Sequence, residues 1–213
     1  MNTDDLISEL ARRVRPANRY AAQKRFAAAS AAGLLASAAA LSLWLGVGPD
    51  PAQAAGAAAF IFKSTYTAAL AALSIFTAFA LLRPDGSGGT RARWLAAPVA
   101  AAALFAINEL VNTPVSAWAD LIMGQDITAC IVRISALASP FLIAFFWAAR
   151  AFAPTNAKAA GGAIGLAAGS LGAMIYSFHC VESAACFIAL WYTAAIALVG
   201  IAGMLLGSRL LRW

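Results

Sequence analysis

The sequence predicts an all-α protein: a six-helix transmembrane bundle preceded by a short cytoplasmic amphipathic N-terminal helix. Three observations support this fold class. Hydrophobic residues make up 62% of the 213 residues and charged residues only 11%, which is not the composition of a soluble globular domain. Six runs of about 20 mostly apolar residues recur, each long enough to cross a hydrocarbon core as a helix. These runs also lack the alternation of a membrane β-barrel.

Residues 1–25 are the soluble-looking part of the chain and are expected to form a cytoplasmic segment. Thr3 is suited to cap a helix whose first turn carries Asp4 and Asp5. An apolar stripe at helical spacing and two nearby cations make up the predicted binding residues: Leu6, Ile7, Leu10, Val14, Arg12 and Arg13. A helix of about three turns is marginal alone in water, so it needs a surface to bind.

Residues 26–213 form the predicted transmembrane domain. Its six spans are expected at about 26–45, 60–82, 94–110, 131–147, 159–178 and 187–206. In the fifth span Gly161, Gly165 and Gly169 stand four residues apart. Small residues at this spacing let helix backbones approach closely, so the fifth span is expected to be central and tightly packed.

The distribution of Lys and Arg predicts how the spans are oriented. Thirteen of the fifteen cations lie in the amino-terminal tail, the second and fourth loops and the carboxyl end. The first, third and fifth loops instead carry acidic residues: Asp50, Asp120, Asp126 and Glu182. The positive-inside rule therefore places both termini of this multi-pass protein in the cytoplasm and the first, third and fifth loops outside. The high net charge reflects this topology, and no direct contact with nucleic acid is predicted.

Three charged residues lie within or beside the predicted spans, towards the external side: Lys63, Glu109 and Arg133. An ionisable group in a span costs several kcal/mol unless it is paired, so Glu109 is expected to form an intramembrane ion pair with Arg133 or Lys63. A small six-span transporter or channel, with these groups in its path, is the alternative interpretation of the same residues.

The cysteines are also expected at the external membrane surface. Cys130 opens the fourth span, and Cys180 and Cys186 lie at the two ends of the fifth loop. Cys130 and Cys180 are candidates for a disulfide or, when reduced, for a soft metal site together with His179 and Glu182. Spacing leaves these alternatives open, and simple burial is a third. Cys186 is expected to be a small apolar residue of the sixth span.

An enzyme is not predicted. A catalytic interpretation would use Cys180 as nucleophile and His179 as base, but adjacent residues rarely point suitably at each other.

Several motifs give the chain a likeness to a known family. These are His179-Cys180-x-Glu182, the F-x-x-x-W-Y pattern that ends at Tyr192, the terminal LLRW and the initial TDDLISELA. Together they resemble the NrsF-type integral-membrane anti-sigma factors. The resemblance implies a six-span inner-membrane protein that holds an extracytoplasmic-function sigma factor inactive. It also implies that Cys130 and Cys180 respond to heavy metals and oxidative stress, while Cys186 matches no family position.

Residues and resemblance together lead to one hypothesis. The amino-terminal helix inserts its apolar stripe into the sigma factor, and a signal at Cys130 and Cys180 changes the arrangement of the last three spans and releases it. The expected partners are the sigma factor and membrane lipid. No cofactor is required, although the cysteines are expected to bind heavy metal transiently. A helix lying on the inner leaflet is the simpler alternative for the amino-terminal segment.

Overall fold

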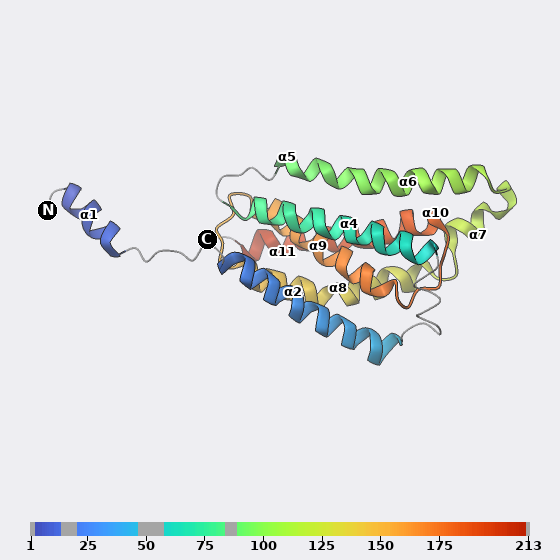
Figure 1. Ribbon diagram of the computed structural model, residues 1–213, viewed down its shortest axis with the longest axis horizontal. Helices are drawn as coiled ribbons and strands as arrows, with labels where there is room; N and C mark the ends of the chain where they lie inside the picture. The colour runs from blue at the N-terminus through green and yellow to red at the C-terminus, as the bar shows by residue number, and fades with distance from the viewer. Residues whose placement is uncertain (1–2, 14–20, 47–57, 84–88, 212–213) are drawn as a thin grey trace.

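The computed structural model describes residues 3–13, 21–46, 58–83 and 89–211, and the regular structure in these ranges is entirely helical (Figure 1). The longer helices are α1 (Thr3–Arg13), α2 (Ala21–Ala40), α4 (Ala58–Leu81), α6 (Ala96–Val111), α8 (Ile127–Ala149), α9 (Ala157–Tyr176) and α11 (Thr193–Leu210). Shorter segments extend or join them: η1 (Leu41–Leu45), α5 (Gly89–Ala92), η2 (Arg93–Leu95), η3 (Val115–Ala117), α7 (Trp118–Met123), α10 (Ala185–Phe187) and η4 (Ile188–Tyr192). The predicted all-α class is confirmed.

Within the described ranges, six helical stretches are long and apolar enough to cross a membrane. They are Gln23–Leu45, Ala58–Leu81, Arg93–Val111, Val115–Ala149, Ala157–Tyr176 and Ala185–Leu210. Each overlaps one predicted span, which confirms the prediction of six such helices. The fourth differs most, because η3 and α7 extend it back to Val115 and α8 itself begins at Ile127 rather than near 131. Asp126 starts it early by accepting a hydrogen bond from the backbone N–H of Ala129 at 2.9 Å.

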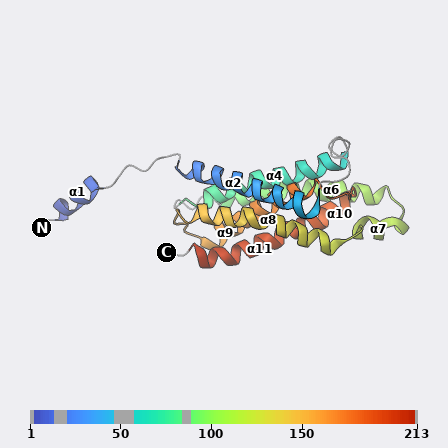
Figure 2. The same cartoon turned by 90° about the horizontal axis from the view of Figure 1, so that it is seen from below.

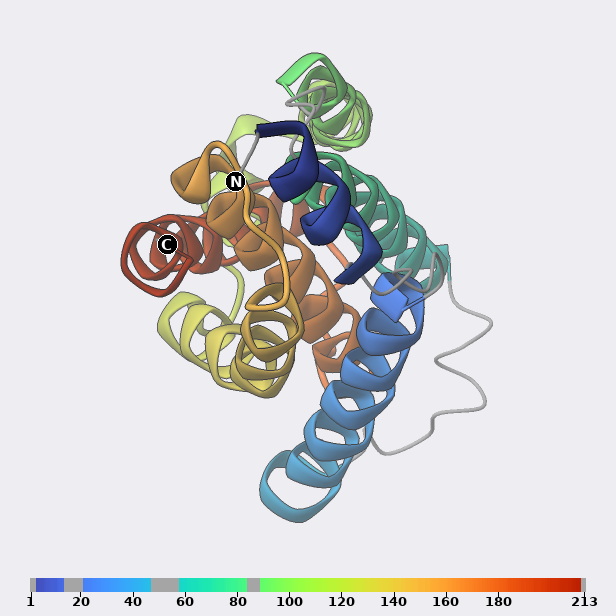
Figure 3. The ribbon, with the colours of Figure 1, turned by 90° about the vertical axis from the view of Figure 1, so that its left-hand side faces the viewer.

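Helix α9 lies at the centre of the bundle, where it contacts α4, α8 and α11 (Figure 3). In its most apolar stretch 67% of the residues are buried, against 11% in the span that contains α6. Gly161 faces Gly203 and Gly207 of α11, and a Cβ added to Gly161 would lie only 2.6 Å from the Cα of Gly207. Glycine therefore lets these two backbones touch, as the spacing in the sequence predicts.

Helix α6 forms an outer layer of the bundle (Figure 1). Its main contacts are with α10, with further contacts to α4 and η4. The large apolar side chains of Leu104, Phe105 and Ile107 are exposed. A helix that presents this much apolar surface is suited to an apolar environment rather than to water.

Successive long helices run in opposite directions, so the two ends of the bundle differ in chemistry (Figures 1 and 2). One end combines the start of α2, the end of α4, the start of α6, the end of α8, the start of α9 and the end of α11. We call it the basic end, after its cations: Lys24, Arg25, Arg83, Arg91, Arg93, Arg150, Lys158 and Arg209. The opposite end contains Cys130, Cys180 and Cys186, and we call it the thiol end.

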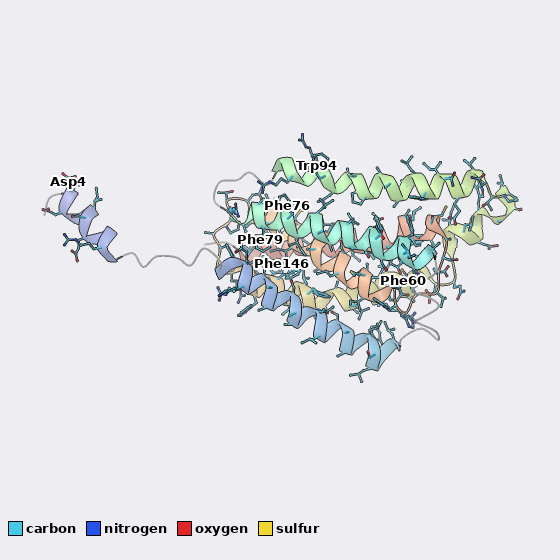
Figure 4. All side chains as sticks on the ribbon, viewed as in Figure 1. Asp4, Phe60, Phe76, Phe79, Trp94 and Phe146 are labelled. Carbon is cyan, nitrogen blue, oxygen red and sulfur yellow. The ribbon has the colours of Figure 1, made fainter. Side chains whose placement is uncertain are left out.

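Aromatic side chains fill the core near the basic end. The ring of Phe26 lies 4.6 Å from that of Phe79 and 5.9 Å from that of Phe145, measured between centroids. Arg25 stacks over Trp147, at 5.1 Å from guanidinium carbon to ring centroid. Arg91 and Arg93 stack on Phe76 and Trp94, which Figure 4 places at the basic end, with Phe60 towards the thiol end. These cations cover apolar rings with their guanidinium groups.

Helix α1 is drawn apart from the bundle (Figures 1 and 4), with Asp4 and Asp5 in its first turn as the sequence predicts. Leu6, Ile7 and Arg12 are exposed. Of the other predicted binding residues, Val14 and the side chains of Leu10 and Arg13 lie outside the described part of the structure.

Candidate functional site

The candidate site is organised by the loop that follows α9, residues 177–184, which we call the thiol loop. It begins with a tight turn in which the N–H groups of His179 and Cys180 donate to the carbonyl of Tyr176 at 2.9 and 3.0 Å. This turn satisfies a carbonyl that the end of α9 would otherwise leave without a partner. It also fixes the direction in which His179 and Cys180 leave the helix.

His179 connects the thiol loop to two other parts of the chain. Its Nε2 lies 3.5 Å from Nη1 of Arg133 in α8, and its Nδ1 lies 3.0 Å from the carbonyl oxygen of Gly46. A guanidinium only donates, so Nε2 accepts and Nδ1 carries the proton that is donated to Gly46. Both ring nitrogens are therefore engaged, and neither is left to act as a base for Cys180.

Lys63 ties the thiol loop to α4. Its side chain is only 3% exposed, and its ammonium donates to the carbonyl oxygens of Cys180 at 2.7 Å and Glu182 at 2.9 Å. Buried ammonium groups are costly unless their N–H donors are satisfied, and here two backbone carbonyls accept from two of the three donors. The sequence offers Lys63 as one of two alternative partners of Glu109, and the structure gives Lys63 backbone oxygens.

Glu182 ties the same loop to the segment that precedes α8. Its Oε1 accepts a hydrogen bond from the backbone N–H of Gln125 at 2.7 Å. The neighbouring Gly124 has a positive φ of 54°, and a Cβ there would lie 3.0 Å from the carboxyl carbon of Glu182. Glycine at this position thus allows the carboxylate to approach the backbone.

Glu109 and Cys186 form a separate contact between α6 and α10. The Oε2 of Glu109 accepts from the backbone N–H of Cys186 at 2.8 Å, and the thiol of Cys186 donates to the carbonyl of Ala106 at 3.2 Å. Glu109 thereby caps the N-terminus of the last helical stretch, where a negative charge is favourable. The expected ion pair of Glu109 with Arg133 or Lys63 does not form among the described residues, because each of the three has a different partner.

The thiols themselves are free, with Cys130 and Cys186 buried and Cys180 half-buried. Cys130 and Cys180 line one hollow of about 340 Å³. The polar side chains that share this hollow are Gln125, Asp126, Arg133, Tyr176, His179 and Glu182. The structure thus brings the four predicted sensor and metal-binding residues, Cys130, Cys180, His179 and Glu182, around a common space. Within the described ranges, no group of three or more His, Cys, Asp or Glu side chains is placed to hold a metal ion.

Three contributors to this site were not predicted from the sequence. They are Gly46, Gln125 and Tyr176, whose ring lies 5.8 Å from that of His179 between centroids. Gly46 and Gln125 take part through backbone groups. Every residue has these groups, so the residue types at 46 and 125 gave no indication of a role in the site. The glycine beside Gln125 was the available indication, since glycine often permits a close approach.

The fold and the site together define a class of protein: an all-α bundle of six long apolar helices with a polar, thiol-bearing cluster at one end and a group of cations at the other. Comparison with known families identifies it further. The family model described as negative regulator of sigma F, NrsF, matches residues 10–213. The chain therefore belongs to the NrsF family.

Two curated relatives match over their full length. The anti-sigma-F factor NrsF of Caulobacter vibrioides (strain NA1000 / CB15N) is 35% identical over 216 residues, covering 100% of both chains. The probable anti-sigma-F factor NrsF of Azospira oryzae (strain ATCC BAA-33 / DSM 13638 / PS) is 31% identical over 217 residues, again covering 100% of both. No solved structure matches the chain significantly.

Proposed function

We propose that this chain is an anti-sigma factor of the bacterial inner membrane. It binds an extracytoplasmic-function sigma factor and releases it when Cys130 and Cys180 encounter heavy metal or oxidant. The observation that carries the proposal is the NrsF family match over residues 10–213, together with two relatives that are matched from end to end and named as anti-sigma-F factors. The role is regulatory rather than enzymatic.

The membrane location is supported by the six apolar helices within the described ranges and by the exposed apolar surface of α6. The positive-inside rule orients the bundle with its basic end, and hence both termini, in the cytoplasm. The thiol end then faces the periplasm, a compartment in which thiols meet oxidants and metals from outside the cell.

The division of labour along the chain follows from this orientation. Residues 1–25 form the cytoplasmic sigma-binding segment, and residues 26–213 form the membrane anchor and sensor. Helix α1 exposes Leu6 and Ile7 on an amphipathic helix, the arrangement that binds an apolar groove of a partner. Leu10, Val14, Arg12 and Arg13 complete the proposed contact, with the arginines facing acidic groups of the sigma factor.

Two chemistries at Cys130 and Cys180 fit the sensing step. An oxidant that accepts two electrons converts the two thiols to a disulfide, and two protons are released. A soft divalent cation displaces both thiol protons and forms two metal–sulfur bonds, with Glu182 and, once its Nε2 gives up the contact with Arg133, His179 as further candidate ligands. Either reaction changes the distance between α8, which carries Cys130, and the thiol loop, which carries Cys180.

The transporter alternative is not favoured by the contacts of the charged residues. Lys63 and Arg133 bind the thiol loop, and Glu109 caps the last helical stretch. These are three separate ties between segments rather than the lining of a shared path.

The test is co-purification of the sigma factor with full-length protein extracted from membranes, with and without cadmium chloride or the oxidant diamide. We expect the sigma factor to co-purify with the resting protein and to be lost after treatment. Cys130→Ser with Cys180→Ser is expected to retain the sigma factor under both treatments, whereas Cys186→Ser, the matched control, behaves like the parent. Normal release from the double variant would exclude the thiols as the sensor. A chain without residues 1–16 that still retains the sigma factor would exclude α1 as the holding element.

A further inference from the structure

The thiol loop is attached to α4 through the side chain of Lys63. The ammonium of Lys63 donates to the carbonyl of Cys180, the residue expected to react, and to that of Glu182, two positions further on. It thus holds the backbone on both sides of Val181. A change in the backbone at Cys180 must therefore alter the position of Lys63 or break the contact.

Burying a lysine side chain at this position has a high free-energy cost. Its side chain is 3% exposed, and no carboxylate lies within ion-pair distance of it in the described part of the chain. Charged groups in a membrane-spanning helix are rare and are generally kept for a function. A leucine or methionine would fill a similar volume without the cost of burying a charge, but it would leave the carbonyls of Cys180 and Glu182 without this donor.

Helix α4 is well suited to carry a displacement from this contact. It spans 24 residues, a length of about 36 Å, and ends beside Arg83 at the basic end. Its principal neighbour is α9. The buried residues of α4 include the small hydroxyl residues Thr67, Ser74 and Thr77. Thr67 and Thr77 bond to carbonyls of their own helix rather than to α9, while Tyr66 bonds to Thr193 of α11.

We propose that Lys63 is the latch that couples the thiol loop to α4. With the latch closed, α4 is held in the position, relative to α9, in which the protein retains the sigma factor. Reaction at Cys180 moves its carbonyl, opens the latch and frees α4 to shift along α9. Lys63 is a positioning residue that acts through the backbone of Cys180, and the inference rests on the proposed function, since it assumes that the thiols are the sensor.

The test uses the full-length chain and its sigma factor in a bacterial host lacking both, with a sigma-dependent reporter and cadmium chloride as inducer. Lys63→Met removes the donors at similar volume, and Lys63→Arg keeps a cation with donors. We expect Lys63→Met to raise the uninduced reporter about tenfold and to abolish further induction, since losing one charge-assisted hydrogen bond shifts an equilibrium by at least about that factor. Lys63→Arg should retain low uninduced activity and respond to cadmium.

Thiol accessibility separates an open latch from an unfolded bundle. In intact cells, a membrane-impermeant maleimide should modify Cys180 about tenfold faster in Lys63→Met than in the parent. Modification of Cys186, which is tied to α6 instead, should stay unchanged. If Cys186 also becomes reactive, Lys63→Gln, which keeps an N–H donor, replaces Lys63→Met, and the expected uninduced reporter then lies between those of Lys63→Met and the parent.

The two proposals fail in different ways. If Lys63→Met has parental uninduced and induced activity while Cys180→Ser cannot be induced, the latch is overturned and the cysteine sensor stands. If Cys180→Ser is induced normally, the proposed sensing function fails whatever the Lys63 variants do.

Discussion

Different interactions stabilise the two ends of the bundle. At the thiol end, side chains of Lys63, His179, Glu182 and Glu109 bond to backbone groups of other segments, so distant parts of the chain meet in specific polar contacts. Towards the basic end, aromatic rings and touching glycine backbones fill the core, and the cations remain at the surface. The thiol end is thus a cluster of directional polar contacts, which a single chemical change can break. The basic end is an apolar core with charged side chains at its surface.

The largest effect on stability is expected at the glycine contact between α9 and α11, where a substitution tests whether glycine is required. Gly161→Ala places a methyl group against the carbonyl of Gly203 and 2.6 Å from the Cα of Gly207, where only backbone can move. We expect a loss of about 3 kcal/mol or more in the free energy of unfolding, because overpacking against backbone forces the helices apart. Reversible unfolding in mixed micelles, followed by circular dichroism, measures it.

Gly162→Ala provides the control for this substitution. The new Cβ would be 3.8 Å from the Cβ of Met204, an ordinary contact distance, although Gly162 is also buried. Because alanine has the higher helix propensity, this variant should equal the parent in stability or exceed it by up to about 1 kcal/mol. Equal losses for the two variants would mean that the α9–α11 contact is not specific to Gly161.

An intermediate effect is expected at the thiol end, where Glu109 caps the last helical stretch. Glu109→Ala leaves the part-buried N–H of Cys186 without its acceptor and should cost about 2 kcal/mol in unfolding free energy. Glu109→Gln keeps a neutral acceptor and should cost about half as much. Exchange of the Cys186 amide hydrogen, measured by mass spectrometry, should accelerate in the same order. An unchanged exchange rate in Glu109→Ala would show that the cap is not formed in solution.

The positions of the apolar helices were predictable because they depend on local properties. Runs of apolar residues must become helices wherever the backbone cannot bond to water, and glycines four residues apart must lie on one face. This is why α9 is central, as the spacing of Gly161, Gly165 and Gly169 predicts. The early start of α8 was missed, since a cap by Asp126 depends on one side-chain rotamer.

The partners of the charged residues were not predictable in the same way. From the sequence, Glu109 is most simply matched with a cation, but the N-terminus of a helix offers N–H groups with no partner in that helix. Lys63 likewise bonds to backbone groups, donating hydrogen bonds to the carbonyls of Cys180 and Glu182. Backbone groups are present at every residue and have no sequence pattern, so only the fold decides which of them a buried charge reaches. The gathering of Cys130 and Cys180 around one hollow depends on the same long-range arrangement.

The smallest effect is expected when the same substitution is made in an arginine at each end. Arg150 is exposed at the end of α8, and Arg150→Gln should change the free energy of unfolding by about 0.5 kcal/mol or less. Arg133 is half-buried and hydrogen-bonded to His179, so Arg133→Gln should cost about 1 kcal/mol. Both losses are measured by unfolding in the same micelles.

The functional readout should rank these two variants in the reverse order. If the basic end presents free charge to an acidic partner, Arg150→Gln binds the sigma factor more weakly than the parent chain does. This difference in affinity shrinks as salt rises, because salt screens the charge that distinguishes the two chains. Arg133→Gln, remote from that surface, should leave the salt dependence unchanged. A stability loss at Arg150 larger than that at Arg133 would mean that the basic end is held by its charges as well. The contrast between polar contacts that stabilise the thiol end and surface charges that do not stabilise the basic end would then not hold.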